Sequence, residues 1–395
     1  MTVLQVHNFY QQPGGEDLAF EAEGELLSQH GHEVIRYTAH NDSIRGMSAP
    51  GAGVRAVWNH DSYQAIRHLL RRHKPAVMHV HNTFPLISPA VHYAAALENV
   101  PVIQTLHNYR LICPAATLFR RGRVCEDCLH SRTHWPAVRH GCYRNSRAAT
   151  AASCCTLALH RAAGTWSRKV QRFIALTKFG KGKFVEGGLA ADRITVKPNF
   201  LIHDPGPGPG GGGYALFAGR LSEEKGVRVM LEAWRKISTI SLKIAGDGPL
   251  RTFVQEEARV IPTVEYLGRC ERPRVLELLQ SAEFLVFPSN WYEGLPMSAI
   301  EAFACGTPIA GSALGSMEEL IQDSVNGVLF PLGDPDSLAS CVEQLATRAR
   351  DMRKAARATL GVGGQRSGSG RVQSSGLYEK SLTPTPADCT CSHAW

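Results

Sequence analysis

The residues of this chain that most readily suggest chemistry are two glutamates, Glu293 and Glu301, which have seven residues between them. Glu293 follows an apolar run in the segment NWYEGL, and Glu301 falls among apolar residues of a stretch with helical spacing. Two carboxylates at one site can act as general acid and base on either side of a bond, or each can accept hydrogen bonds from ligand hydroxyls. A carboxylate in apolar surroundings needs a partner, so we expect Glu301 to bind a polar ligand.

A pair of cations follows another apolar run. The segment LFAGRLSEEKG places Arg220 and Lys225 after a predicted strand that ends at Ala218. Arginine offers a planar fork that matches phosphate oxygens, and lysine supplies a compact positive charge. Together they suit a diphosphate whose negative charge grows while a bond to it breaks. The alternative is a pair of solvated cations in a loop.

Glycine-rich turns occur where two further strands are expected to end. Gly14 and Gly15 follow the first apolar run, and Gly246 and Asp247 follow the run SLKIA. Glycine lets a backbone approach a ligand closely, and the amides at a helix start attract negative charge. Such turns are also common without any ligand, so these positions are candidates for ligand binding and nothing more specific.

A helix start and a histidine complete the set of candidate residues. Pro296 suits the first turn of a helix, so the backbone amides of Met297 and Ser298 are expected to be free to bind a phosphate. His81 and His107 come at the ends of two predicted strands. A single histidine is most often structural. Three loops that follow strands are expected to converge here, however, and this favours a role for His107.

Short apolar runs alternate with helical stretches along most of the chain, which is typical of α/β proteins with parallel sheets. Proline and glycine in the segment 204–213 break the alternation and predict a linker. We therefore expect two doubly wound, Rossmann-like domains, residues 1–203 and 214–360, that face each other across a cleft. Ligands bind beyond the carboxyl ends of the strands in such sheets. Residues 361–395 show no periodicity, and we expect most of them to be disordered.

The composition is ordinary for a folded, water-soluble protein: 395 residues, 44% of them hydrophobic and 20% charged. The formal net charge of +8 favours anionic partners, such as nucleotide phosphates or acidic lipid headgroups. Aromatic and basic residues are not interleaved as on a nucleic-acid surface, so no nucleic acid is expected. Without a signal peptide or a long apolar run, we expect a cytoplasmic protein, with peripheral contact to the inner face of an anionic membrane.

Four of the eleven cysteines fall in one insertion that is rich in arginine and histidine. Cys125 and Cys128 form a Cys-x-x-Cys pair, with Cys113 upstream and Cys142 downstream. In a cytoplasmic protein such thiols are expected to be reduced or bound to metal rather than joined in disulfides. Four thiolates at this spacing can hold a structural zinc ion. The alternative is a set of free thiols in a loop.

Taken together, these segments resemble the retaining, nucleotide-sugar-dependent glycosyltransferases of family 4, which have the GT-B fold. The resemblance extends over roughly residues 1–345. It rests on motifs in a fixed order: GGED, HVHN, TLHNYRLICP, VKPN, FAGRLSEEKG, IAGDGPL, the segment with Glu293 and Glu301, and SVNGVLFPLGDPDSLA. It implies transfer of a sugar, with retention of anomeric configuration, from a UDP- or GDP-sugar to a glycan or lipid-linked acceptor.

The resemblance also implies roles for the matching residues. Gly15 would lie beside the donor diphosphate, and Arg220 and Lys225 would bind it, so that no catalytic metal is expected. Glu293 would lie beside the hydroxyls of the sugar. His107 would lie near the transferred sugar, and the ribose would be the ligand of the second glutamate, Glu301.

Two departures leave parts of this picture open. Where relatives often have Gly-Gly-x-Pro-Glu, the segment LGSMEE has Ser316 and Glu318 in place of Gly and Pro, and keeps Glu319. The fragment GLYEKSL, inside the tail, is all that resembles the usual returning C-terminal helix. The alternatives are a nucleotide-sugar 2-epimerase of the same fold and an inactive homologue that acts as a binding protein. The sequence does not indicate the sugar, the base, the acceptor or the oligomeric state.

Overall fold

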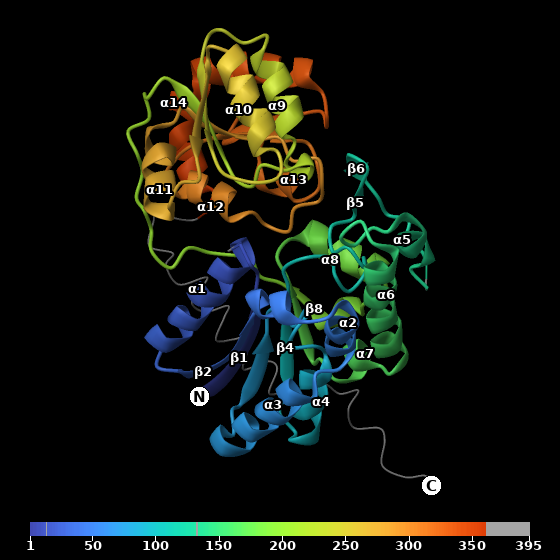
Figure 1. Cartoon of the computed structure of the whole chain (residues 1–395). Coiled ribbons are helices and arrows are strands. Elements are labelled where there is room, and N and C mark those ends of the chain that lie inside the picture. Colours follow the sequence, from blue (N-terminus) through green and yellow to red (C-terminus); the bar gives the residue numbers. More distant parts are fainter. Residues whose placement is uncertain (13, 132, 361–395) are drawn as a thin grey trace.

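The computed structural model describes residues 1–12, 14–131 and 133–360. Within them the chain forms two α/β halves, each built on one six-stranded parallel sheet (Figure 1). This confirms the predicted α/β architecture. The predicted disordered tail lies outside the described residues. No helix in the described part of the chain is long and apolar enough to cross a membrane.

The sheet of the first half has the strand order β2-β1-β3-β4-β7-β8, and all its pairs are parallel. β3 is buried along its whole length, as expected for a parallel strand covered by helices on both faces. The six strands are β1 (Thr2–Phe9), β2 (Glu33–His40), β3 (Val77–Val80), β4 (Val102–Leu106), β7 (Arg172–Ala175) and β8 (Ile194–Val196).

Helices surround this sheet, and an insertion follows β4. The insertion holds a short antiparallel pair, β5 (Phe119–Arg120) and β6 (Arg123–Val124), which rises beside the second half in Figure 1. The helices of the first half are α1 (Gly15–Gln29), η1 (Asn41–Gly46), α2 (Ala49–Val57), α3 (His60–His73), α4 (Ala90–Leu97), α5 (Trp135–His140), α6 (Arg147–Ala162), α7 (Thr165–Arg168), α8 (Lys178–Glu186) and η2 (Ala191–Arg193).

The sheet of the second half has the order β11-β10-β9-β12-β13-β14. Counted along the chain, this is the Rossmann order: β10 and β11 are added on one side of β9, and β12 to β14 on the other side. The strands are β9 (Tyr214–Ala218), β10 (Ser241–Ala245), β11 (Val264–Gly268), β12 (Phe284–Phe287), β13 (Ile309–Ser312) and β14 (Gly327–Phe330). The helices are η3 (Glu223–Lys225), α9 (Val227–Trp234), α10 (Arg251–Val260), α11 (Arg272–Ser281), α12 (Met297–Ala304), α13 (Ser316–Leu320) and α14 (Pro335–Ala358).

The predicted linker 204–213 lies along the second half instead of spanning open space. Its backbone amides at Gly208 and Gly210 donate to the carbonyls of Cys305 and Gln280, each at 2.9 Å. A Cβ at position 208 would come within 2.2 Å of the Gln280 carbonyl oxygen. Glycine is therefore needed there for close backbone packing. The predicted domain boundaries at 203 and 214 stay a prediction.

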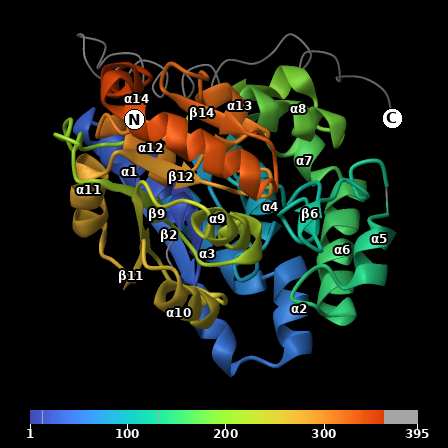
Figure 2. The same ribbon diagram turned by 90° about the horizontal axis from the view of Figure 1, so that it is seen from above.

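The two halves are in contact through apolar side chains and through helix starts. Leu176 of the first half packs in one cluster with Leu295, Met297 and Ile300 of the second. α13 packs against α8, and Figure 2 shows α12 lying over α1. The carboxyl ends of the two sheets, where both topologies are expected to bind ligands, thus meet at this contact.

Candidate functional site

Lys225 and Glu293 meet at the point in the second sheet where the strand order reverses, between β9 and β12. Lys225 follows β9 and Glu293 follows β12, and the Lys225 ammonium lies 2.7 Å from Glu293 Oε1. The same oxygen accepts hydrogen bonds from the Ser289 hydroxyl (2.6 Å) and the Trp291 indole (2.7 Å). Glu293 is only 5% exposed. Three donors on one oxygen hold this buried carboxylate fixed in place.

The loop that carries Glu293 reaches the first half of the chain. A Cβ at Gly294 would lie 2.9 Å from the carbonyl oxygen of His107, so the two backbones touch at this glycine. The Glu293 carbonyl accepts from the Ser316 hydroxyl at 3.0 Å. The structure therefore brings His107 and Glu293, which are 186 positions apart in the sequence, to one place.

His107 is the end of a buried chain of polar groups behind the interdomain contact. Its Nε2 lies 3.0 Å from Nδ1 of His81, whose ring stands near Glu23, and Glu23 Oε1 accepts from the Lys197 ammonium at 2.8 Å. Burial, and then the neighbouring His7, lower the pKa of His107 to about 3. Both linked imidazoles are thus neutral near pH 7. His107 Nδ1 is buried and has no hydrogen-bond partner among the described residues.

Glu16, which the sequence did not single out, links the loops that follow β1, β3 and β4. Its Oε1 accepts from Asn82 and its Oε2 from Asn108, each at 3.0 Å. Burial raises the pKa of this carboxyl group. The only sequence signal was a carboxylate directly after two glycines, and it does not identify the partners.

The two predicted glycines after β1 have different surroundings. Gly14 precedes α1, and a Cβ built on it would touch nothing within 4 Å. Gly15 is the first residue of α1, and its Cβ would lie 3.3 Å from Cγ of Met297, the first residue of α12. Helix starts from both halves therefore meet at Gly15. The first amides of α12, those of Met297 and Ser298, have no partner within the helix and lie at the same contact.

Arg220 was predicted to bind a diphosphate, and the turn after β10 was a candidate for ligand binding. Arg220 is exposed and makes no hydrogen bond or ion pair with the described residues. A Cβ at Gly246 would lie 1.9 Å from the Gly219 carbonyl oxygen, so this glycine is required for loop packing. The Asp247 carboxylate accepts from its neighbour, the Gly248 amide, at 2.8 Å. Packing therefore accounts for the Gly246 turn without a ligand.

Glu301 does not share the contacts of Lys225 and Glu293. It is 5% exposed, and its Oε1 accepts from Arg272 Nε of α11 at 2.8 Å. Burial raises its pKa, and the Arg272 charge opposes this change. In the described chain the partner of this buried carboxylate is an arginine that is itself half exposed, and the expected polar ligand stays a prediction.

The altered segment 314–319 supports the contact between the halves. The Glu319 carboxylate accepts from the backbone amides of Lys178, at 3.0 Å, and Phe179, at the start of α8. A carboxylate at a helix start satisfies free amides and interacts favourably with the helix dipole. The Phe179 ring also lies 4.7 Å from that of Tyr292, beside Glu293.

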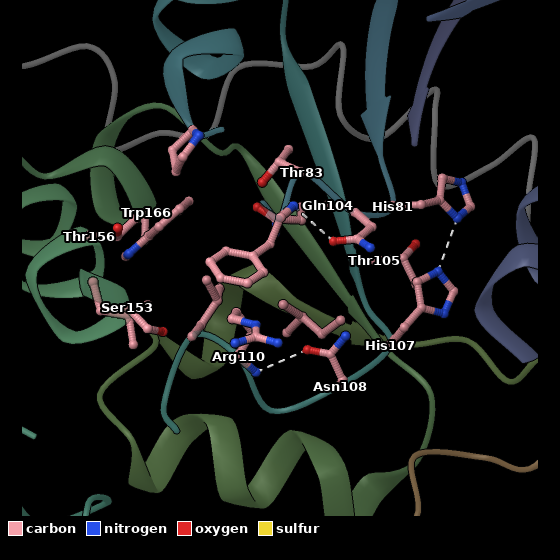
Figure 3. Close-up of a pocket in the computed structure, with 16 residues that line it drawn as sticks. His81, Thr83, Gln104, Thr105, His107, Asn108, Arg110, Ser153, Thr156 and Trp166 are labelled. Atoms are coloured by element: carbon pink, nitrogen blue, oxygen red, sulfur yellow. Dashed lines mark hydrogen bonds between the residues drawn. The ribbon is translucent and has the colours of Figure 1, made fainter. Parts of the chain in front are cut away.

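A pocket opens in the first half beside His107 (Figure 3). His81 and His107 line one side, and Ser153, Thr156 and Trp166 line the opposite side. Its polar lining also includes Thr83, Gln104, Asn108 and Arg110. The Trp166 indole nitrogen is buried without a hydrogen-bond partner among the described residues. The pocket offers both an apolar surface and unused polar groups to a ligand.

The cysteines of the insertion stay thiols in the structure. Cys113, Cys125, Cys128 and Cys142 form no disulfide. Among the described residues, the one group of three side chains whose ligand atoms all lie within 4.8 Å is Glu23, His79 and His81. The predicted zinc site stays a prediction on this geometry and is considered further below.

Comparisons with known proteins place this site in context. Residues 212–348 match the family model described as glycosyl transferases group 1. The chain is 35% identical over 136 residues to an uncharacterised glycosyltransferase of Methanocaldococcus jannaschii, covering 33% of this chain and 35% of that protein. It is 31% identical over 155 residues to the D-inositol 3-phosphate glycosyltransferase of Mycobacterium avium, covering 36% of each. The chain thus spans about a third of the length of these curated relatives.

The structural comparison covers nearly the whole chain. The crystal structure of Anabaena HepE in complex with UDP aligns with 96% of this chain and 100% of that one, with a TM-score of 0.66 and 17% identity. Together with the two parallel sheets, this similarity shows that the chain has the GT-B fold of glycosyltransferases, as the sequence predicted. The match to the group 1 model covers β9 to α14, the half that contains Arg220, Lys225 and both glutamates.

Proposed function

We propose that this protein is a retaining glycosyltransferase of the family 4 type, which moves a hexose from a nucleotide diphosphate sugar to a glycan or lipid-linked acceptor. The observation that carries the proposal is the Lys225–Glu293 ion pair, placed where the loop of Gly294 touches His107. A cation and a fixed carboxylate from one half thus adjoin a neutral histidine from the other. This arrangement suits a sugar diphosphate bound between the halves.

Each group has a distinct part in the proposed reaction. Arg220 and Lys225 bind the diphosphate and stabilise the charge that develops on it as the glycosidic bond breaks. The amides of Met297 and Ser298 and the close backbone at Gly15 complete the anion site. Because these groups neutralise the leaving diphosphate, the reaction needs no catalytic metal. Glu293 accepts from hydroxyls of the sugar.

His107 and Glu301 bind the two ends of the donor. The unpartnered Nδ1 of His107 is available to a hydroxyl of the transferred sugar, because its Nε2 is already engaged by His81. Glu301 accepts hydrogen bonds from the ribose hydroxyls after the Arg272 side chain has moved away from it. The Arg272 side chain is 42% exposed, which allows this movement. The two glutamates are therefore separate hydroxyl ligands of one molecule and not an acid–base pair.

For the donor we propose a UDP-hexose ahead of a GDP-sugar. The support is that structures of Anabaena HepE, which shares the fold, hold UDP and UDP-glucose. The acceptor would enter the pocket beside His107. We further propose that the reaction takes place in the cytoplasm, and that basic residues outside the site, such as Lys74 and Arg72, allow peripheral contact with an anionic membrane.

The test is donor binding followed by product analysis. Calorimetric titration with UDP-glucose, UDP-galactose, UDP-N-acetylglucosamine and GDP-mannose should show binding of at least one donor, and Arg220→Ala should weaken it about 10-fold or more. The anomeric configuration of the product, read by proton NMR, should equal that of the donor. Absence of binding to every member of the panel would rule out the proposal, and an inverted product would rule out retention.

A further inference from the structure

The four cysteines of the insertion come together from separate parts of the chain. Cys128 belongs to a small apolar cluster with Ala137 and Cys154, and Cys142 packs against this cluster. The Cys128 thiol lies close enough to those of Cys113 and Cys125 for their charges to affect its pKa, after the larger effect of burial. Cys113 and Cys128 are each 8% exposed. The insertion thus brings the four cysteines into one neighbourhood.

The insertion has little regular structure that could hold it in this shape. Between Cys113 and Cys142 its described residues form two strands of two residues and one helix of six. Six of the ten non-glycine residues with positive φ in the described chain lie in or next to it, and this left-handed conformation is unfavourable for residues other than glycine. They are Ala116, Leu118, Arg121, His134, Arg144 and Asn145. Such loop-rich modules usually depend on a cross-link or a metal.

The charges around the thiols favour a thiolate–metal centre over a cross-link by oxidation. Arg120 Nε lies 3.4 Å from Cys125 Sγ, and its guanidinium also pairs with Asp127. A zinc ion bound by four thiolates has a net charge of −2, which a neighbouring guanidinium stabilises. The group formed by Glu23, His79 and His81 does not need a metal ion to supply positive charge. The Lys197 ammonium, 2.8 Å from Glu23 Oε1, already supplies it.

The sulfur atoms must move closer together before they can bind one zinc ion. No three of the four sulfurs in the described chain all lie within 4.8 Å of one another. Zinc–sulfur bonds of about 2.3 Å place the sulfurs of a tetrahedral site about 3.8 Å apart. Rotation about χ1 moves a cysteine sulfur by up to about 3 Å with the backbone unchanged. Side-chain rotation is thus the adjustment that ion binding requires.

We propose that Cys113, Cys125, Cys128 and Cys142 bind one structural zinc ion that fixes the insertion. The site would also hold a contact between the halves of the chain. Glu126, between the paired cysteines, lies 2.7 Å from the Lys183 ammonium of α8, which in turn lies 5.6 Å from the centre of the Tyr292 ring. The zinc ion would therefore position Glu126 against the residue that precedes Glu293.

Metal analysis of the full chain tests the proposal. Protein purified without chelators from zinc-supplemented cells should contain about one zinc per chain, and Cys128→Ser and Cys142→Ser should each lose most of it. Cys155→Ser, an exposed cysteine on α6, should keep the zinc. So should the double variant Cys389→Ser/Cys391→Ser, which removes a further closely spaced pair in the sequence. Glu126→Gln should also keep it.

A measurement on the wild-type protein covers the case in which the cysteine variants do not fold. After removal of zinc under reducing conditions, added Co²⁺ should give the strong visible bands of tetrahedral cobalt and a thiolate-to-cobalt charge-transfer band. Any of three results would overturn the proposal: freshly purified protein without zinc and without these cobalt bands, zinc that disappears with Cys389 and Cys391 alone, or a disulfide among the four cysteines. None of these readouts depends on transferase activity.

Discussion

The ammonium of Lys225 and the carboxylate of Glu293 form a direct ion pair of 2.7 Å within the part of the chain that carries the group 1 match. The cation proposed to bind the diphosphate is therefore held by the carboxylate proposed to bind the sugar. A donor that occupies both positions must share Lys225 between a phosphate oxygen and Glu293. The two ends of the donor are thus coupled through one side chain.

Removal of Lys225 should affect catalysis much more than stability. For Lys225→Ala we expect kcat/KM to fall about 10²–10³-fold, because a charge directed at the leaving diphosphate is lost. Glu293 keeps the Ser289 and Trp291 donors, so the fold should survive. Initial-rate kinetics with the donor selected by titration provide the measurement. Lys236→Ala, which breaks an exposed pair with Asp336, is the control. Equal losses in both variants would contradict the assignment.

The neighbouring glycines of the first loop allow a matched comparison. Gly15→Val should place a branched side chain against Met297 and force the starts of α1 and α12 apart, whereas Gly14→Val meets open space. We expect turnover to fall about 10-fold or more in the first variant, since a small misplacement of reacting groups is costly. The second should stay within about 2-fold of wild type. If the two variants behave alike, helix contact is not the reason for glycine at position 15.

Glu319 should control how tightly the halves close. Glu319→Ala removes the acceptor of the Lys178 and Phe179 amides and should cost the closed state about 1 kcal/mol. The expected result is a larger radius of gyration in small-angle X-ray scattering, with a higher KM for the donor. Glu343→Ala, an exposed carboxylate on α14, is the matched control. An unchanged scattering profile and KM would show that the hydrogen bonds from the α8 amides to Glu319 are not needed to hold the halves together.

Stability should decline on the acid side of neutrality because of buried histidines. Burial lowers the pKa of His79 and His92 to about 4, whereas an unfolded histidine titrates near 6.5. Between these values the unfolded chain binds more protons, so the free energy of unfolding falls as the pH drops. Each such histidine contributes about 1.4 kcal/mol per pH unit, and the effect vanishes above about pH 6.5.

The test of this prediction is the slope of stability against pH in urea unfolding from pH 7 to pH 5. His92→Gln, away from Lys225 and Glu293, should reduce the slope by about one proton whatever its effect on absolute stability. His203→Gln, at an exposed side chain, should leave the slope unchanged. A His92→Gln slope identical to that of wild type would contradict a role for the buried neutral imidazole.

The sequence was sufficient for the architecture and for the elements that carry the candidate residues. Apolar runs bounded by turn residues predicted β9 and β12, and hence the placement of Lys225 and Glu293 after neighbouring strands. Pairing within a Rossmann order then brings the two loops together. His107 was predicted for the same reason, as a polar residue directly beyond β4.

The partners of these residues could not be predicted from the same patterns. Arg272 for Glu301 and the α8 amides for Glu319 depend on how helices of different segments pack, which no local spacing encodes. The reason for glycine at position 246 was also hidden. Its requirement comes from the carbonyl of Gly219 across the sheet, and a glycine-rich turn looks the same in sequence whether it meets backbone or ligand.

The hydrogen bonds that hold segment 204–213 against the second half determine how the chain can be divided into fragments. The Arg353 guanidinium of α14 donates to the carbonyls of Gly208, Gln280 and Cys305 at 3.1–3.2 Å. A fragment that begins at Tyr214 would lose part of this arrangement, whereas one that begins at Asp204 would keep it. Any hinge between the halves must then lie upstream of this segment, between Val196 and Asp204. The proline- and glycine-rich segment 204–213 therefore moves together with the second half.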